Sequence, residues 1–108
     1  MALFEYRVYE AVPGQLPALH RRFETITLDY FKKHGIGVVG FWDVVAGTTN
    51  ELHYILRFED LGDREKAWGA FQADPGWNRD RAETERDGPL VARVHNQFWR
   101  ATEYSPLK

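Results

Sequence analysis

The hydrophobic pattern of this chain changes period along its length, and the resulting order of elements most constrains its fold. Apolar and polar residues alternate in the opening segment LFEYRVYE, which is typical of a β-strand. Between Leu16 and Tyr30 the apolar residues recur every three or four positions, which predicts an amphipathic helix ending before Gly35. The complete prediction has strands at residues 3–10, 37–45, 51–59 and 94–103, a helix at 15–34, and a second helical region at 61–87 that restarts at Asp74-Pro75.

This order is that of a ferredoxin-like βαββαβ sandwich, an α+β fold in which a four-stranded antiparallel sheet carries both helices on one face. The turn-forming segment GTTN between the second and third strands favours an antiparallel hairpin. No repeat, low-complexity tract or linker interrupts the pattern, and 108 residues suit one domain rather than two. We therefore predict a single domain spanning residues 1–108.

The third predicted strand has two different faces. One parity is uniformly apolar and should lie beneath the helices, whereas the other mixes apolar and polar side chains. Because two helices cover only one face of a sheet, the mixed face would stay open, and a partly apolar open face favours a second copy of the chain as its partner. We therefore predict a homodimer. The helix-facing set is Leu52, Tyr54, Leu56 and Phe58, and the candidate interface residues are His53, Ile55 and Arg57.

Charge and cysteine content exclude several classes of function. The 14 basic and 16 acidic residues are interspersed, so nucleic acid and anionic membranes are not expected partners. The absence of cysteine excludes disulfides, thiolate zinc sites and cysteine catalysis. The single serine, Ser105, lies in the tail beside a proline, which argues against a serine nucleophile. No apolar run reaches membrane-spanning length and the first strand leaves no room for a signal peptide, so we expect a cytoplasmic protein without membrane insertion.

Distinctive residues recur at characteristic intervals through the run HGIGVVGFWDVVAGTTNELHYILRFEDLGDREKAWGAFQADPGW and in the SP of the closing YSPLK. With the opening YRVY and the helix end KKHG, they cover nearly the whole chain, and together they resemble the NIPSNAP family. The resemblance implies a ferredoxin-like subunit of the dimeric α+β barrel type. It also implies an architectural relation to small monooxygenases that hold a hydrophobic substrate between sheet and helices. The most specific positions are His34-Gly35, Gly40, Trp42, Asn50, His53, Asp63-Arg64, Asp74-Pro75 and Trp77.

The histidine spacing gives little support for a metal site. His20 and His34 are roughly 21 Å apart along one predicted helix, so they cannot share an ion. His20 and Glu24 have ligand-like spacing, but a surface pair one turn apart has the same spacing. His20 also borders the apolar stripe, either as a partly buried side chain bonded to a backbone carbonyl or as a general base. No dinucleotide, phosphate-loop or zinc-protease motif occurs, so neither a metal nor any other cofactor is predicted.

Aromatic side chains raise the possibility of a pocket between the sheet and the helices. Aromatic residues at helical spacing usually form core, but four tryptophans in so short a chain leave gaps when they pack beneath only two helices. A pocket lined by such rings would suit a small hydrophobic or aromatic ligand. The candidate ligand-binding residues are His20, Phe23, Trp42, Tyr54, Arg64, Trp68, Phe71 and Trp77.

Arg64 occupies an unexpected position in this set. It falls on the helical stripe of Leu61, Trp68 and Phe71, where a core-facing helix should carry another hydrophobe. One interpretation is a bidentate salt bridge to a nearby acid, with the arginine stem lying over Trp68. The other is recognition of a ligand carboxylate or carbonyl in the pocket. The acids considered as partners are Glu59, Asp60 and Asp74.

Three functions remain open from the sequence. The first is binding of a small hydrophobic or aromatic ligand in a pocket between sheet and helices, with His20 and Arg64 as its polar groups. The second is a non-enzymatic dimeric interaction module whose aromatic residues form only core. The third is a cofactor-independent enzyme of the monooxygenase type. A cavity with polar side chains reaching into it would favour the first or third function, and a solid core would favour the second.

Overall fold

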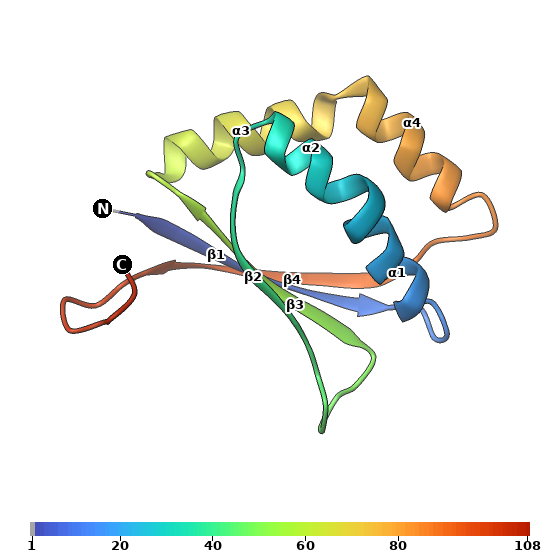
Figure 1. Ribbon diagram of the computed structural model, residues 1–108, viewed down its shortest axis with the longest axis horizontal. Helices are drawn as coiled ribbons and strands as arrows, with labels where there is room; N and C mark the ends of the chain where they lie inside the picture. Colours follow the sequence, from blue (N-terminus) through green and yellow to red (C-terminus); the bar gives the residue numbers. More distant parts are fainter. Residues whose placement is uncertain (1) are drawn as a thin grey trace.

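The predicted order of elements is confirmed by the computed structural model, which describes residues 2–108. One helical region precedes the β-hairpin and a second precedes the last strand, so the architecture is the expected βαββαβ sandwich (Figure 1). In chain order the elements are β1 (Leu3–Ala11), α1 (Leu16–Arg22), the π-helical η1 (Phe23–Thr27), α2 (Leu28–Lys33), β2 (Gly37–Asp43), β3 (Glu51–Phe58), α3 (Leu61–Ala73), α4 (Pro75–Thr84) and β4 (Val91–Arg100).

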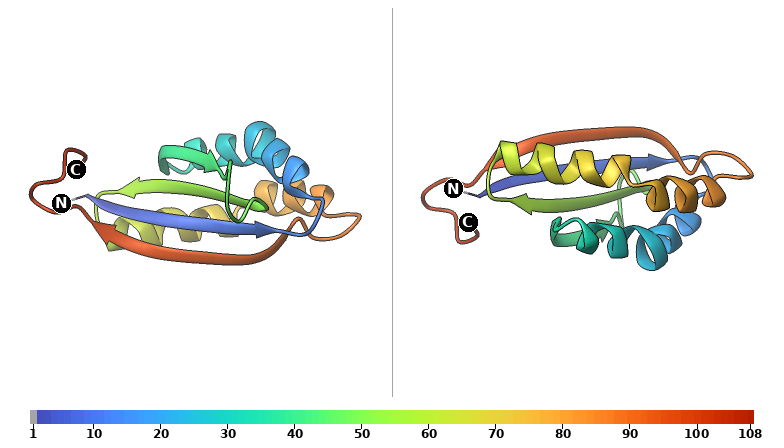
Figure 2. Two further views of the ribbon diagram at one scale, coloured as in Figure 1. Left: turned by 90° about the horizontal axis from the view of Figure 1, so that it is seen from below. Right: turned by 90° about the horizontal axis from the view of Figure 1, so that it is seen from above.

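The four strands form one antiparallel sheet in the order β2-β3-β1-β4. All helices lie on the same side of this sheet, and the two termini lie near one another (Figure 2). The last strand begins at Val91 and ends at Arg100, not at the predicted residues 94 and 103. Its limits follow from its partner, because Val91 pairs with Ala11 and Arg100 pairs with Leu3 at the two ends of β1. No helix within residues 2–108 is long and apolar enough to cross a membrane.

A π-helical segment changes which side of the first helical region faces the sheet. The predicted stripe included Ile26 and Tyr30, but these side chains are only partly buried, and Thr27 and Phe31 occupy the core-facing positions instead. Residues spaced by four drift around an α-helix of 3.6 residues per turn. The wider i→i+5 turn of η1 absorbs this drift. The buried face therefore consists of Leu19, Phe23, Thr27 and Phe31, each four residues after the last.

The start of α3 follows the sequence prediction except at Leu61. An Asp at position 60 with Asp63 at the third helical position predicts an N-cap, and the Asp60 carboxylate does accept a hydrogen bond of 2.7 Å from the Asp63 backbone N–H. Leu61, assigned to the buried stripe, is 53% exposed, and that assignment is wrong. Leu61 is the first residue of the helix, and the contact of α3 with the sheet begins one turn later at Arg64.

Asp74 joins the helices to one another. Its carboxylate accepts hydrogen bonds from the backbone N–H groups of Gly76 and Trp77 and so caps α4. The same carboxylate accepts bonds of 2.8 Å from Lys33 and 2.7 Å from His34 at the end of α2. The hydrogen bonds from the Lys33 and His34 side chains hold the pKa of Asp74 well below its usual value. Asp74 therefore ends α3 with its extended backbone, and its carboxylate begins α4 and anchors α2.

The central strand β1 turns charged side chains toward the helices. Glu5 and Arg7 pair directly with Leu56 and Tyr54 of β3, so they lie on the helix-covered face with the apolar core. The Glu5 side chain is completely buried. Its carboxylate accepts bonds of 2.8 Å from Nη1 of Arg7 and 3.0 Å from Nδ2 of Asn96. A buried carboxylate is retained at acceptable cost only when it has such donors.

Arg64 completes the coordination of this carboxylate. Its Nε and Nη2 donate to Oε1 and Oε2 of Glu5, both at 3.0 Å, and its guanidinium lies 5.2 Å from the Trp68 ring centroid. The bidentate salt bridge beside Trp68 was anticipated from the sequence, but its partner was not. The Arg64 guanidinium does not bond to Glu59, Asp60 or Asp74, because strand β1 brings Glu5 from a distant part of the chain to the surface beneath α3.

We predict that Arg64→Leu lowers the free energy of unfolding by about 1–3 kcal/mol, because Glu5 stays buried with fewer donors. Urea titration of both proteins measures this difference. The matched control is Arg79→Leu, which removes an exposed arginine from a surface pair with Asp80 and should change stability by less than about 0.5 kcal/mol. Equal stability of Arg64→Leu and wild type would contradict a structural role for the pair.

The same pair predicts a specific pH dependence. Burial alone would raise the pKa of Glu5, but the hydrogen bonds from Arg64 and Asn96 and the charge of Arg7 together hold it below its usual value. A depressed carboxyl pKa stabilises the fold above the unfolded-state value of about 4.3, and this stabilisation disappears as the pH falls through the folded-state pKa. Glu5→Gln should therefore have a lower free energy of unfolding than wild type at neutral pH, and this difference should shrink below about pH 4.

Unfolding measured from neutral to acidic pH in both proteins tests this expectation. Glu83→Gln is the control, since Glu83 forms an exposed ion pair with Arg86. Its removal should leave the loss of stability at acidic pH unchanged. If the free energies of unfolding of wild type and Glu5→Gln differ by the same amount across the pH range, the Glu5 charge contributes nothing to stability.

Candidate functional site

A cavity of about 430 Å³ lies between the sheet and the helices, within the size range typical of small-molecule sites. β1 and β4 contribute to its walls from the sheet, and α1, η1, α2, α3 and α4 contribute from the helical layer. Polar and aromatic side chains dominate this surface. The lining residues are Arg7, Tyr9, Arg22, Phe23, Thr27, Phe31, Trp68, Phe71, Gln72, Trp77, Asn78, Arg81, Glu85, Pro89, Val91 and Val94.

Aromatic rings in mutual contact form the apolar part of the cavity wall. The centroid of Phe71 lies 5.1 Å from those of both Trp68 and Phe31, and 4.8 Å from that of Trp77. Phe23 adds an edge-on contact with Phe31. Rings at these separations attract one another beyond simple burial, and their large flat side chains have few rotamers. The wall is therefore a connected surface of rings from four helical segments, η1, α2, α3 and α4.

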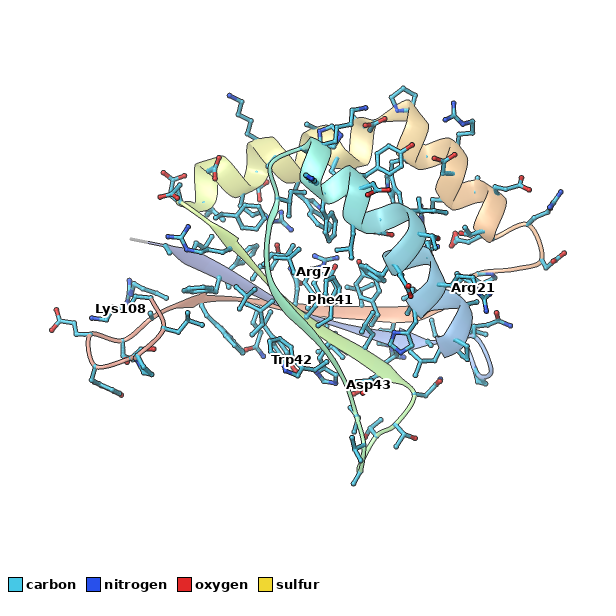
Figure 3. All side chains as sticks on the ribbon, in the orientation of Figure 1. Arg7, Arg21, Phe41, Trp42, Asp43 and Lys108 are labelled. Atoms are coloured by element: carbon cyan, nitrogen blue, oxygen red, sulfur yellow. The ribbon has the colours of Figure 1, made fainter. Side chains whose placement is uncertain are left out.

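Arg7 provides a fixed charge on the sheet side of the cavity. Its side chain points from β1 toward the helices (Figure 3). Nε donates to the Tyr54 hydroxyl at 2.8 Å, Nη1 donates to Glu5 at 2.8 Å, and the guanidinium stacks 4.3 Å from the Trp68 centroid. Burial raises the pKa of Tyr54, so its phenol stays protonated and donates to the Tyr9 hydroxyl at 2.9 Å. These contacts together hold the Arg7 side chain in one conformation.

Arg22 is held much less firmly on the helix side. Only 5% of this residue is exposed, yet its charged contacts are long: 3.3 Å from Nη1 to the Thr84 hydroxyl and 3.7 Å to Glu85. Burial lowers the pKa of its guanidinium, and the Glu85 charge opposes this shift only in part. Among residues 2–108, Nε of Arg22 and the hydroxyl of Thr27 have no hydrogen-bond partner although both are buried. Unmatched buried polar groups of this kind are uncommon in folded proteins.

The candidate residues from the sequence divide among different environments. Four of them, Phe23, Trp68, Phe71 and Trp77, line the cavity. His20 and Trp42 instead line a second, more open hollow of about 680 Å³ between the first helical region and the β-hairpin, which shares Phe23. Tyr54 is fully buried beneath the cavity, and Arg64 is engaged by Glu5. The structure therefore does not bring His20 and Arg64 together as the polar groups of one pocket.

The remaining histidines are separated in the same way. His34 bonds to Asp74 among the helices, and His95 contacts Glu10 at the sheet surface. Nδ1 of His53 lies 2.6 Å from the Tyr6 hydroxyl on the face of the sheet opposite the helices. Within the part of the chain that the structure describes, no cluster of three or more histidine and acidic side chains could hold a metal ion.

Sequence reasoning missed the two buried arginines, Arg7 and Arg22, and the threonine of the cavity. The alternation of the first strand places Arg7 on the face of Glu5 and Tyr9, but a charged side chain in an alternating strand normally faces solvent, so Arg7 was not expected in the cavity. Arg22 and Thr27 are polar residues in an amphipathic helix, so they were excluded from its buried stripe. The spacing of four from Leu19 through Phe23 to Thr27 was the available signal, because it fits a helix containing a π turn better than a regular α-helix.

The open face of the sheet carries the predicted interface residues. His53, Ile55 and Arg57 lie on it by register, beside Tyr6, which stacks on Trp99 at 4.7 Å between ring centroids. Trp42 of β2 lies on the same face by its pairing with His53, on the side of the sheet away from the helices (Figure 3). Trp42 is 51% exposed and Trp99 is 40% exposed. Large aromatic surfaces are therefore uncovered on this side of the sheet.

Comparison with solved structures places this fold among NIPSNAP proteins. A NIPSNAP family protein with unknown function from Agrobacterium tumefaciens is 28% identical, with 99% of this chain and 94% of that chain covered and a TM-score of 0.87. Another NIPSNAP family protein from the same organism is 17% identical over 100% of both chains, with a TM-score of 0.89. A NIPSNAP-like domain protein from Burkholderia xenovorans is 22% identical over 97% of this chain and 89% of that chain, with a TM-score of 0.86. No curated protein matches at a significant level.

The family model gives the same answer over almost the entire length of the chain. The model described as NIPSNAP matches residues 4–106, from the first strand to the segment after β4. The match includes both helical regions and nearly all of the four strands. The chain therefore belongs to the NIPSNAP family.

Proposed function

We propose that this protein binds a small hydrophobic or aromatic molecule in the cavity between the sheet and the helices. The observation that carries the proposal is a 430 Å³ cavity that combines a wall of connected aromatic rings with polar and charged side chains. Ligand sites commonly combine an extensive apolar lining with a few polar groups that fix orientation. Trp68 and Trp77 contribute large rings to the cavity wall, and Arg22 and Thr27 offer unmatched polar groups.

A second function, a dimeric interaction module, is supported by the open face of the sheet. Trp42 and Trp99 are both exposed there, and Ile55 lies between them in the sheet register. An uncovered aromatic surface on a small domain favours an interface, and a two-fold pairing of identical sheets would form the dimeric barrel expected from the family resemblance. This proposal is compatible with ligand binding, because the cavity lies on the opposite side of the sheet.

The remaining sequence predictions stay predictions. A cofactor-independent oxygenase would use the same cavity to hold its substrate, and binding must be established before a reaction is assigned. The cytoplasmic location rests on the sequence pattern alone.

We predict that a neutral aromatic ketone, 2-acetonaphthone, raises the melting temperature of the protein. A ligand that binds only the folded state stabilises it by mass action, by about 2.7 kcal/mol at a concentration of about 100 times Kd. Val94→Trp should abolish the response, because Val94 is half-exposed on β4 at the cavity wall and a large ring there would occupy the space. Differential scanning calorimetry and isothermal titration measure the two effects.

Val45→Trp is the matched control for this experiment. Val45 is exposed and lines the second hollow, not the cavity, so the same substitution there should leave the ketone response intact. Loss of binding in Val45→Trp with retention in Val94→Trp would assign the ligand to the hollow beside His20. No response in the wild-type protein, together with no bound small molecule in native mass spectra of the freshly purified protein, would overturn the proposed function.

For the interface, we predict that Ile55→Asp reduces the dimer fraction seen by sedimentation at micromolar concentration. The substitution would bury an unpaired charge between two sheets, which costs several kcal/mol. Leu61→Asp is the control, because Leu61 is exposed at the start of α3 and an acidic residue there suits the helix dipole. A strictly monomeric wild-type protein would contradict the dimer.

A further inference from the structure

The cavity walls carry more positive than negative charge. Arg7, Arg22 and Arg81 line the cavity, and Glu85 is the only carboxylate among its lining residues. The Glu85 carboxylate faces two arginines: one oxygen lies 3.7 Å from Nη1 of Arg22 and the other lies 3.7 Å from Nε of Arg81. Neither distance is that of a hydrogen bond. The cavity therefore contains cationic groups whose charge is incompletely matched by the protein.

The two buried arginines of the cavity differ in how they are held. Arg7 donates at 2.8 Å to both Glu5 and Tyr54 and stacks on Trp68, so its guanidinium is already held by protein groups. Arg22 has only the long contacts to Thr84 and Glu85, and its guanidinium lies 5.9 Å from the Trp77 centroid. Because these contacts are long, the Arg22 guanidinium can turn toward a ligand oxygen and give up little hydrogen-bond energy. Arg22, not Arg7, has donors available.

Thr27 supplies a second unused donor on the same wall. Thr25, on the outer side of the same helical segment, donates its hydroxyl to the backbone carbonyl of Arg21 at 2.7 Å, which is the usual arrangement for threonine in a helix. The buried hydroxyl of Thr27 makes no such bond within residues 2–108. Thr27 is 3% exposed, and leaving its hydroxyl unmatched costs stability in the ligand-free protein.

The π-helical turn brings these groups to one wall of the cavity. Arg22 is the residue before η1, and Phe23 and Thr27 are its first and last residues. All three line the cavity, and the π turn offsets the drift of about 40° that each four-residue step accumulates on a regular α-helix. Insertions of this kind often occur at functional sites, where they redirect side chains. Here the turn combines a cation, an aromatic ring and a hydroxyl on a single surface.

We propose that the ligand of this cavity is an organic anion, an aromatic or aliphatic carboxylate, whose carboxylate group is bound by the Arg22 guanidinium and the Thr27 hydroxyl. This inference rests on the proposed function and specifies its ligand class. The planar guanidinium matches a carboxylate in a bidentate geometry, and a charge-assisted hydrogen bond is stronger than a neutral one. The aromatic wall from Phe23 to Trp77 then contacts the apolar body of the ligand.

The test compares 2-naphthylacetate with 2-naphthylacetamide, which have the same shape and differ in charge. Isothermal titration at constant ionic strength and neutral pH should show that the acid binds at least about tenfold more tightly than the amide. Arg22→Met should weaken binding of the acid by about tenfold or more and change binding of the amide little. Arg21→Met is the matched control, because Arg21 is the preceding residue of α1, its side chain is exposed, and its loss changes the net charge equally (Figure 3).

Thr27→Val gives an independent result if Arg22→Met does not fold. Valine has nearly the shape of threonine, so the substitution removes an unmatched buried hydroxyl and should leave the free protein equally or more stable. The same change should weaken binding of the acid severalfold. A purely structural role for Thr27 predicts no loss of affinity, so opposite changes in stability and binding are specific to a ligand-binding hydroxyl.

The possible outcomes separate this inference from the proposed function. Equal affinity for the acid and the amide, with 2-acetonaphthone also bound, would overturn the anion inference and leave the proposed function standing. An acid preference unchanged in both Arg22→Met and Thr27→Val would overturn the assignment of these two residues. Absence of binding by the acid, the amide and the ketone would overturn the proposed function, and the inference with it.

Discussion

The buried carboxylate of Glu5 is the interaction on which the arrangement of the structure depends. It lies on the central strand and accepts hydrogen bonds from Arg7 on the same strand, Asn96 on β4 and Arg64 on α3. One group thereby connects two strands to a helix across the sheet surface. Because a buried charge without donors would cost several kcal/mol, this network strongly favours one position of α3 over the sheet. The position of α3 in turn sets where Trp68 and Phe71 form the cavity wall.

Charged groups in this interior are combined with aromatic rings. Trp68 has the Arg7 guanidinium 4.3 Å and the Arg64 guanidinium 5.2 Å from its ring centroid, which compensates part of the desolvation cost of both cations. Arg22 lacks comparable contacts, and this contrast is the physical basis for assigning it a ligand. The protein thus has two kinds of buried arginine, one that supports the fold and one that has unused hydrogen-bonding capacity.

The order of elements, the antiparallel hairpin and the capping role of Asp60 could be predicted because they depend on short-range patterns and turn chemistry. The ion pair of Arg64 could be predicted in kind, since an arginine on an apolar stripe needs an acceptor. Its partner could not be, because Glu5 becomes a neighbour only through the pairing of β1 with β3. The buried positions of Thr27 and Phe31 were missed for a related reason, since a π turn leaves only a weak trace in the spacing.

For the candidate site, the sequence by itself determined its aromatic composition and its general place between sheet and helices, because large apolar side chains at helical and strand spacing must be buried together. Only the tertiary structure decided its polar groups. It excluded Arg64 and His20 from the cavity wall and brought Arg7, Arg22 and Thr27 to it. The physical reason is that a polar side chain is stable in a core only where specific partners from other elements meet it, and such meetings are properties of packing, not of local periodicity.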